Sequence, residues 1–383
     1  MPPMEIIKRI LSIQLPAGKS AFLWGPRKVG KSFWIKQHLK EDILIDLLKT
    51  DVFAQYASRP ALLRERFSAS DQRIIIDEVQ MIPDLLNEVH WLMENKNISF
   101  LLTGSSARKL RRKQAHLLGG RAWRYIMTPL CYPEIHEHDI EKIMISGLLP
   151  SHFLATDPIP ELRAYVADYL KEEIAAEAVV RNIPAFAEFL RVAALTTGEL
   201  LNYTNVARET GVSAKVVRHY FQILEDTLLG FRLPPWRRAK NRRLIETEKF
   251  YLFDIGLSNY LAQRKPKYGT PEFGKSFEHY ILLELMAYKA YRNPELLLYY
   301  WRTSTGQEVD FILGDAEIAI EVKASHRIHS HDTKALTLLK EEQPIKRSIL
   351  ISFEKEPKIL GNQIECLHWT MFLRELWEGR LGI

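Results

Sequence analysis

The chain has 383 residues, of which 46% are hydrophobic and 26% are charged, and its formal net charge is +6. This composition is typical of a globular protein with buried cores, and the length allows two or three domains. Two cysteines exclude a disulfide scaffold, and no run approaches the ~18 apolar residues of a membrane span. The start lacks an apolar signal core, so we expect a short amphipathic helix there and a cytoplasmic location.

The first motif, GPRKVGKS, follows a short apolar run at 21–25 and precedes a helix-like segment at 31–40. A strand, a glycine-rich loop and a helix in this order predict a phosphate loop, because the loop N–H groups at a helix N-terminus favour an anion. Lys31 is predicted to reach the β- and γ-phosphates of ATP, and Ser32 to hold Mg²⁺. The predicted nucleotide-binding residues of the loop are Gly25, Pro26, Arg27, Lys28, Val29, Gly30, Lys31 and Ser32.

The second motif, RIIIDEVQMIPDLL, is an apolar strand that ends in Asp77 and Glu78. Two carboxylates at the end of a buried strand are costly unless they serve a cation or a reacting water. Asp77 suits magnesium, and Glu78 suits polarising the attacking water. A pair that is merely solvated is the alternative, and the phosphate loop upstream favours the catalytic interpretation.

Polar side chains also follow a third apolar strand, at 98–106. Thr103 lies at its end and is predicted to sense the γ-phosphate, although a helix cap is an equally simple role for a hydroxyl there. Arg121 follows two glycines in a loop. It is predicted either as an arginine finger that reaches the nucleotide of a neighbouring copy or as an ordinary exposed arginine.

The segments GPRKVGKS, IIIDEVQMIPDLL, LLTGSSARKL and LGGRAWRYIMTPLCYPE resemble, in order and spacing, a group of bacterial and archaeal AAA+ ATPases. The likeness extends over nearly the whole chain. It implies ATP and Mg²⁺ as cofactors, a nucleotide at the positions named above, and a homo-oligomer such as a hexamer. Cys131 stands where a serine is commoner in this group, a change with no obvious chemical consequence.

The middle part, 151–265, is predicted to be helical and to contain a helix-turn-helix with Lys215 and Arg218 on the outer face of its second helix. The next segment, FRLPPWRRAKNRRLIETEKFYLFD, indicates a hairpin wing with Trp236 stacking on a base or bracing the hairpin. Clustered cations at its tip suit DNA phosphates, although a solvated charge run is the alternative. The predicted DNA-binding residues are Lys215, Arg218, Arg237, Arg238, Lys240, Arg242 and Arg243. A second basic cluster lies at 108–113.

The last part, 266–383, has the order helix, three strands, helix, strand, with Glu278 on the first helix. Its order and its Glu…Asp…Glu-x-Lys pattern resemble the restriction-endonuclease-like core and its PD-(D/E)xK signature. Glu321 and Lys323 share one face of a strand, where the lysine can orient a water. The predicted catalytic residues are Asp310, Glu321 and Lys323, and the predicted magnesium ligands are Glu278, Asp310 and Glu321. The alternative is a nuclease fold that has lost its activity and serves to contact DNA or protein.

These observations predict an α/β chain of three parts: an AAA+ phosphate-loop domain at 1–150, a helical and winged-helix domain at 151–265, and a nuclease-like domain at 266–383. The expected function is ATP-driven processing of DNA, with branched DNA as the favoured substrate and no membrane partner. The alternative is a nucleotide switch that recruits a partner without cutting. A transcription regulator that uses the winged helix alone ranks last, because it leaves the other two parts idle.

Overall fold

The computed structural model describes residues 6–15, 19–40, 42–68, 73–106, 118, 121–176, 182–238 and 243–383. The chain forms two compact units. The N-terminal unit consists of Lys8–Thr128 with Ile223–Leu229, and the C-terminal unit contains Pro129–Gln222 with Gly230–Ile383. Except for Ile223–Leu229, the predicted middle and last parts thus belong to one compact unit, which also includes 129–150. No helix in the described residues is long and apolar enough to cross a membrane.

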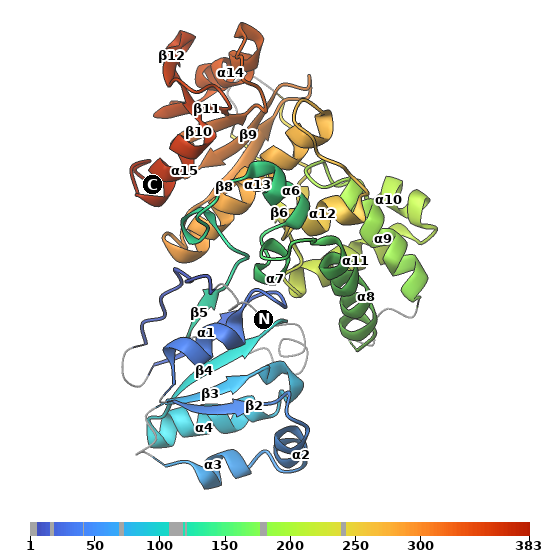
Figure 1. The fold of residues 1–383 in the computed structure, drawn as a ribbon, viewed down its shortest axis with the longest axis vertical. Coiled ribbons are helices and arrows are strands. Elements are labelled where there is room, and N and C mark those ends of the chain that lie inside the picture. Colours follow the sequence, from blue (N-terminus) through green and yellow to red (C-terminus); the bar gives the residue numbers. More distant parts are fainter. Residues whose placement is uncertain are drawn as a thin grey trace. The chain divides into compact units, whose positions relative to one another are not determined.

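The N-terminal unit is a five-stranded parallel sheet of order β2-β3-β4-β1-β5 with helices on both faces (Figure 1). Its strands are β1 (Ser20–Trp24), β2 (Ile43–Asp46), β3 (Arg73–Asp77), β4 (Ser99–Gly104) and β5 (Ala122–Ile126). Its helices are α1 (Lys31–His38), α2 (Thr50–Ser58), α3 (Leu62–Arg66) and α4 (Leu85–Lys96). The apolar strands β1, β3 and β4 are buried on both faces, as a parallel sheet requires.

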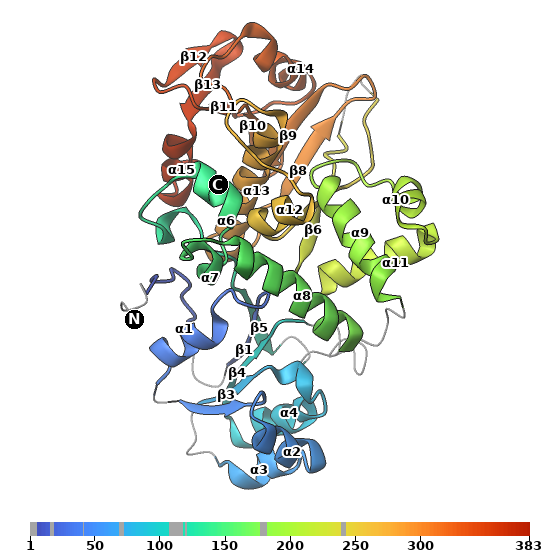
Figure 2. The ribbon, with the colours of Figure 1, turned by 45° about the vertical axis from the view of Figure 1, so that its right-hand side comes forward.

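Helices α2, α3 and α4 cover one face of this sheet and pack in one core with β1, β3 and β4, whereas α1 lies on the other face (Figure 2). The chain start does not form the amphipathic helix that we expected, since 6–15 have no regular secondary structure. Instead the segment contacts the phosphate loop and α1. Leu11 accepts a hydrogen bond from the indole of Trp34 at 3.3 Å through its carbonyl.

Helices precede the sheet of the C-terminal unit, as predicted. They are α6 (Ile140–Ser146), α7 (Pro150–Phe153), α8 (Ile159–Ala176), α9 (Ile183–Leu195), α10 (Tyr203–Thr210), α11 (Ala214–Asp226) and α12 (Ile255–Leu261). The helix-turn-helix is α10 and α11. Asn202 caps α10 by accepting from the N–H of Asn205 at 3.0 Å, and Gly211 ends it with φ of +67°.

The C-terminal unit contains a six-stranded sheet of order β12-β13-β11-β10-β9-β8. Its strands are β8 (Leu298–Arg302), β9 (Glu308–Leu313), β10 (Ile318–Val322), β11 (Arg347–Ser352), β12 (Lys358–Leu360) and β13 (Ile364–His368). Helices α13 (Pro271–Tyr291) and α15 (Trp369–Trp377) pack on one face, and α14 (Lys334–Glu342) packs on the other. The predicted order of helix, three strands, helix and strand is confirmed.

The predicted wing is a short antiparallel hairpin of β6 (Gly230–Leu233) and β7 (Lys249–Leu252), but it does not project freely. Its two arms, 234–236 and 244–245, hydrogen-bond along β8. The N–H of Trp236 donates to the carbonyl of Tyr300 at 2.6 Å, and the N–H of Ile245 donates to that of Arg302 at 2.9 Å. The hairpin arms therefore extend the large sheet beyond β8, and the role of the hairpin as a DNA-binding wing stays a prediction.

Candidate functional site

The loop between β1 and α1 has the backbone of a phosphate loop. Lys28 and Gly30 have φ of 63° and 99°, so the chain turns through the left-handed region twice before the helix. A Cβ on Gly25 would lie 2.6 Å from the carbonyl oxygen of Met127, which explains the glycine there. The buried Lys31 donates through Nζ to the carbonyls of Gly25 at 2.7 Å and Pro26 at 3.0 Å. The ammonium is therefore held at the loop itself.

Three residues predicted from separate motifs meet at Asp77, which is 4% exposed at the end of β3. Ser32 donates from Oγ to Asp77 Oδ2 at 2.7 Å. Thr103, at the end of β4, donates to the other oxygen of the same carboxylate. The neighbouring carboxyl ends of β3 and β4 place these groups beside α1. A serine hydroxyl joined to an aspartate is the pair that holds Mg²⁺ in phosphate-loop enzymes.

Glu78 is the first residue after β3 and has φ of 59°, a left-handed conformation that is strained for a side chain of this size. Its N–H donates to Thr103 Oγ1 at 3.4 Å. The buried Gln80 donates to the Glu78 carboxylate and also to Ser105 Oγ at 3.2 Å. Gln80 was not among the predicted residues. The sequence signal that could have revealed Gln80 is its polar side chain in a turn that also contains the apolar residues Val79 and Ile82.

Two arginines of the N-terminal unit differ in role. Arg9 is 7% exposed, donates to the carbonyl of Val29 in the phosphate loop, and donates to that of Thr128 at 2.7 Å. No sequence motif points to it, because its partners are backbone carbonyls far along the chain. Arg121 pairs with Glu94 at 2.7 Å. Its proposed reach to a neighbouring copy stays a prediction.

In the C-terminal unit, Asp310 on β9 and Glu321 on β10 are 8% and 5% exposed. Asp310 accepts from the N–H of Val322 at 2.7 Å, and Glu321 Oε1 accepts from Lys323 at 2.5 Å. Glu321 Oε2 is buried, and no group of the described residues forms a hydrogen bond with it. Burial raises the pKa of Glu321 to about 7, against the opposing charge of Lys323, and burial and Glu321 raise that of Asp310. The predicted Asp310, Glu321 and Lys323 are thus brought together.

Lys249 on β7 is a residue of this cluster that the sequence did not reveal. Its side chain is 2% exposed, and its ammonium pairs with Glu278 at 3.4 Å and with Glu308. Tyr251 donates to Glu278 at 2.7 Å. Burial acts to lower the pKa of Lys249, but the charges of Glu278, Glu308 and Asp310 outweigh it, so the pKa is raised. Lys249 is therefore a buried cation among carboxylates.

Lys249 forms an ion pair with Glu278, one of the three predicted magnesium ligands. Glu278 lies on α13 as expected, but Lys249 and Tyr251 hold its carboxylate. Within the described ranges, no group of three or more Asp, Glu, His or Cys side chains is arranged to hold a metal ion. The arrangement thus differs from the predicted three-carboxylate magnesium site, and Asp310 and Glu321 are the two carboxylates that remain beside Lys323.

The basic residues of the predicted DNA surface are partly exposed. Lys215 and Arg218 are exposed on α11, and the guanidinium of Arg218 lies 5.0 Å from the ring centre of Tyr203. Arg237 and Arg243 are exposed, and each is the residue next to one arm of the hairpin, Arg237 after 234–236 and Arg243 before 244–245.

Two residues of the predicted hairpin wing have partners inside the unit. Arg238 pairs with Asp315 at 2.9 Å. Trp236 is 5% exposed in the core on the α14 face of the sheet, so it braces the hairpin and cannot stack on a base. Lys240, Arg242 and the cluster at 108–113 lie outside the described residues.

Three family models match consecutive parts of the chain. Residues 17–136 match a family described as an AAA domain, residues 137–268 a domain of unknown function (DUF8612), and residues 273–372 a domain of unknown function (DUF4143). The first match agrees with the phosphate-loop geometry described above. Residues 17–136 are therefore similar to AAA domains, and they contain the phosphate loop.

The chain is also similar to proteins from mycobacteria and archaea. It is 28% identical to the uncharacterized protein Rv2008c of Mycobacterium tuberculosis over 245 residues, 62% of this chain and 55% of that protein. It is 23% identical to the uncharacterized protein MJ1544 of Methanocaldococcus jannaschii over 355 residues, 83% of this chain and 77% of that protein. The chain thus aligns with only about half the length of the mycobacterial relative.

Solved structures of ORC1 and DnaA proteins give weaker similarities. The Aeropyrum pernix ORC1 protein in complex with DNA aligns with a TM-score of 0.24 at 14% identity, over 64% of this chain and 86% of that one. AMPPCP-bound DnaA from Aquifex aeolicus aligns with a TM-score of 0.26 at 13% identity, over 54% of this chain and 81% of that one. TM-scores of this size do not establish a shared fold over the aligned length.

Proposed function

We propose that the protein is an ATPase that hydrolyses ATP in its N-terminal unit and processes DNA with its C-terminal unit. The observation that carries the ATPase part is the junction at Asp77, where Ser32 and Thr103 donate to one buried carboxylate. Lys31 is held at the same loop by backbone carbonyls. Hydroxyl, carboxylate and ammonium in this arrangement fit a magnesium–nucleotide complex.

The residues around this junction have distinct tasks in the proposed reaction. Ser32 and Asp77 would hold Mg²⁺, which would supply positive charge beside the phosphates of the nucleotide. Lys31 neutralises the phosphates, while Glu78 orients the attacking water and draws off its proton. Gln80 fixes the Glu78 carboxylate. In a homo-oligomer such as a hexamer, Arg121 is the side chain that we propose to complete the nucleotide site of a neighbouring copy.

The DNA contacts of the proposal rest on exposed cations of the C-terminal unit. Lys215 and Arg218 lie on the second helix of a helix-turn-helix, and Arg237 and Arg243 lie next to the hairpin arms. Such side chains contact phosphates, which positions the protein without reading sequence. We therefore propose nucleic-acid binding of low sequence specificity.

Neutralising Arg237 and Arg243 should weaken DNA binding equally for unrelated sequences. In the double variant Arg237→Gln/Arg243→Gln, the slope of log K against log salt should fall by about two, because each lost phosphate contact removes about one counterion. Fluorescence anisotropy with labelled DNA at several salt concentrations measures this. The variant Arg163→Gln/Arg292→Gln is the control, since it removes the same charge from two other exposed positions. Equal slopes for the two variants would contradict the proposal.

The nuclease part of the proposal rests on Asp310, Glu321 and Lys323. Glu321 Oε2, which forms no hydrogen bond with the described residues, is a buried acceptor that fits a divalent cation, and Asp310 is the second carboxylate beside it. Lys323 is placed to orient a water near that cation. Lys249 already supplies positive charge beside Glu278 and Glu308, so we propose one metal ion rather than two. Branched DNA stays the favoured substrate.

Asp310→Asn should remove Mg²⁺-dependent cleavage while ATP hydrolysis and DNA binding stay near the parent values. The amide keeps the hydrogen bond from Val322 but loses the charge that the metal needs. Gel assays with linear, forked and four-way DNA, with and without Mg²⁺ and ATP, measure the effect. Asp315→Asn, in the exposed turn after β9, is the matched control.

A second function is favoured by Lys249. Because this lysine holds Glu278 and Glu308, the cluster is already partly neutralised without a metal. If the parent protein cuts none of the three DNA forms with Mg²⁺ or Mn²⁺, the nuclease proposal fails. The protein is then better described as an ATP-dependent switch whose C-terminal unit holds DNA or a protein partner.

A further inference from the structure

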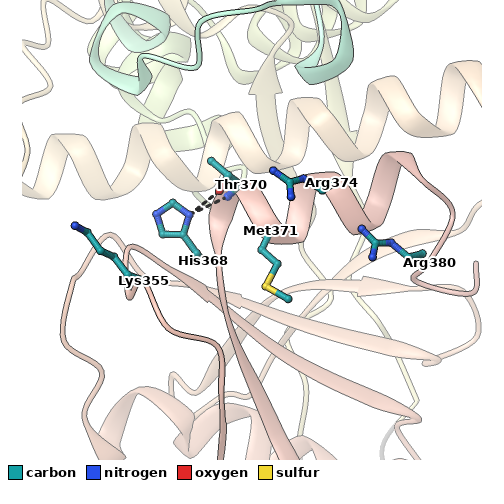
Figure 3. Close-up of a pocket in the computed structure, with 6 residues that line it drawn as sticks. All are labelled: Lys355, His368, Thr370, Met371, Arg374 and Arg380. Carbon is teal, nitrogen blue, oxygen red and sulfur yellow. Dashed lines mark hydrogen bonds between the residues drawn. The ribbon is translucent and has the colours of Figure 1, made fainter.

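A pocket of about 500 Å³ opens on the C-terminal unit beside α15, and its lining is cationic. Figure 3 shows Lys355 at one end, His368 and Thr370 near the middle, and Arg374 and Arg380 toward the other end. The sixth lining residue is Met371, and none of the six carries a carboxylate. This α15 pocket plays no part in the ATP site or in the carboxylate cluster described above.

The charges of the pocket are largely available. Within the described ranges no carboxylate pairs with Lys355 or Arg374, whereas Arg380 pairs with the exposed Glu378. The positive charges of Lys355 and Arg374 therefore lie together without an ion-pair partner among the described residues, which is the condition for attracting an anion.

His368 adds a directed donor. Its Nδ1 accepts from the N–H of Thr370 at 3.4 Å and bonds the Thr370 hydroxyl at 2.7 Å. A ring nitrogen that accepts from a backbone N–H carries no proton, so the hydrogen of the neutral ring lies on Nε2. Burial lowers the pKa of His368, and the charges of His326 and Lys355 lower it further. A bound anion would act in the opposite direction.

The position of His368 in the sheet relates the pocket to the proposed nuclease site. Strands β10, β11 and β13 are parallel and end at one edge, where Val322 aligns with Ile351 and Ser352 aligns with His368. His368 is thus two strands away from the end of β10 that leads to Lys323, which is about 10 Å at the usual strand spacing. One DNA strand carries a phosphate about every 3.4 Å of helix axis, so that separation spans about three phosphates.

We propose that the α15 pocket binds phosphate groups of a nucleic-acid strand that runs along this edge of the sheet. Two arginines and a lysine supply charge, and the Nε2–H of His368 supplies a hydrogen bond to a phosphate oxygen. Met371 gives the apolar contact that a sugar requires. The inference rests on the proposed DNA function, but it assigns a binding site separate from the hairpin and the helix-turn-helix.

The test compares two variants of equal charge. Lys355→Gln/Arg374→Gln/Arg380→Gln neutralises the pocket, and Lys346→Gln/Arg163→Gln/Arg292→Gln removes one lysine and two arginines elsewhere. We expect the pocket variant to lower the slope of log K against log salt for DNA by about one per phosphate held, while the control stays within about half a unit of the parent. Equal slopes for both variants, in a parent that binds DNA, would overturn the proposal and leave the DNA function standing.

A second experiment tests whether the phosphate group that the pocket binds belongs to a nucleic-acid backbone or is free inorganic phosphate. The pKa of His368, followed by NMR and assigned with His368→Gln, should rise when a short oligonucleotide binds and should not rise with inorganic phosphate at the same phosphate concentration. A rise with inorganic phosphate alone would make the pocket a free-phosphate site and overturn the nucleic-acid assignment. If the parent binds no DNA and neither ligand moves the pKa, both the DNA function and the pocket proposal fail.

Discussion

Glu78→Gln should lower ATP hydrolysis by about a hundredfold or more while ATP remains bound. The amide has nearly the shape of the carboxylate but cannot take a proton from the attacking water. Lys31 and Asp77 are untouched, so the contacts to phosphate and magnesium persist. Steady-state turnover and the equilibrium binding of a fluorescent ATP analogue, measured on the same preparation, separate the two effects.

Lys31→Ala is the contrasting variant. It should weaken nucleotide binding as well as hydrolysis, because the ammonium leaves the β- and γ-phosphates. The control for Glu78→Gln is Glu65→Gln, which removes a negative charge from an exposed position on α3 of the same unit. ATP turnover by Glu78→Gln at the parent rate would assign water activation to another residue and contradict the role given to Glu78.

Lys249→Met should destabilise the C-terminal unit by about 3 kcal/mol. Removing one partner of a buried ion pair leaves the other charge without compensation, and here two glutamates, Glu278 and Glu308, lose the same cation. Urea unfolding followed by tryptophan fluorescence measures the change, since Trp301 lies in the core of this unit.

A compensating variant gives the control. In Lys249→Met/Glu308→Gln one of the two carboxylate charges that lost the partner Lys249 is removed, so part of the lost stability should return. Lowering the pH should also reduce the loss, because protonation removes the carboxylate charges that lack a partner. Unchanged stability of Lys249→Met would show that these ion pairs do not hold the cluster, and tighter Mn²⁺ binding by that variant would then support a three-carboxylate metal site.

The N-terminal site was largely predictable because its signals are local. GPRKVGKS specifies the loop, and the apolar strands before Asp77 and Thr103 specify two buried strands with polar ends. Parallel strands in one sheet bring such ends to a common edge, which is why Ser32, Asp77 and Thr103 meet in the structure. Arg9 was beyond this reasoning, since its partners are backbone carbonyls that any residue offers.

In the C-terminal unit, local sequence patterns predicted only part of the carboxylate cluster. The element order and the Glu-x-Lys spacing on β10 predicted the neighbourhood of Asp310, Glu321 and Lys323. Lys249 lies on a strand of the hairpin, and its contact with Glu278 depends on how that hairpin packs, which no local pattern records. Trp236 did carry a signal. A large apolar residue within a basic run is costly to leave in water, and the structure buries it.

The pairing of the hairpin arms with β8 also affects how the protein behaves at high concentration. A sheet edge presents unpaired N–H and C=O groups, which can capture a strand from another molecule and start aggregation. The arms at 234–236 and 244–245 occupy that edge at Tyr300, Arg302 and Thr303. At the other edge, β12 has only three residues and begins with the lysine Lys358. The basic hairpin therefore keeps the long edge of the sheet from recruiting foreign strands.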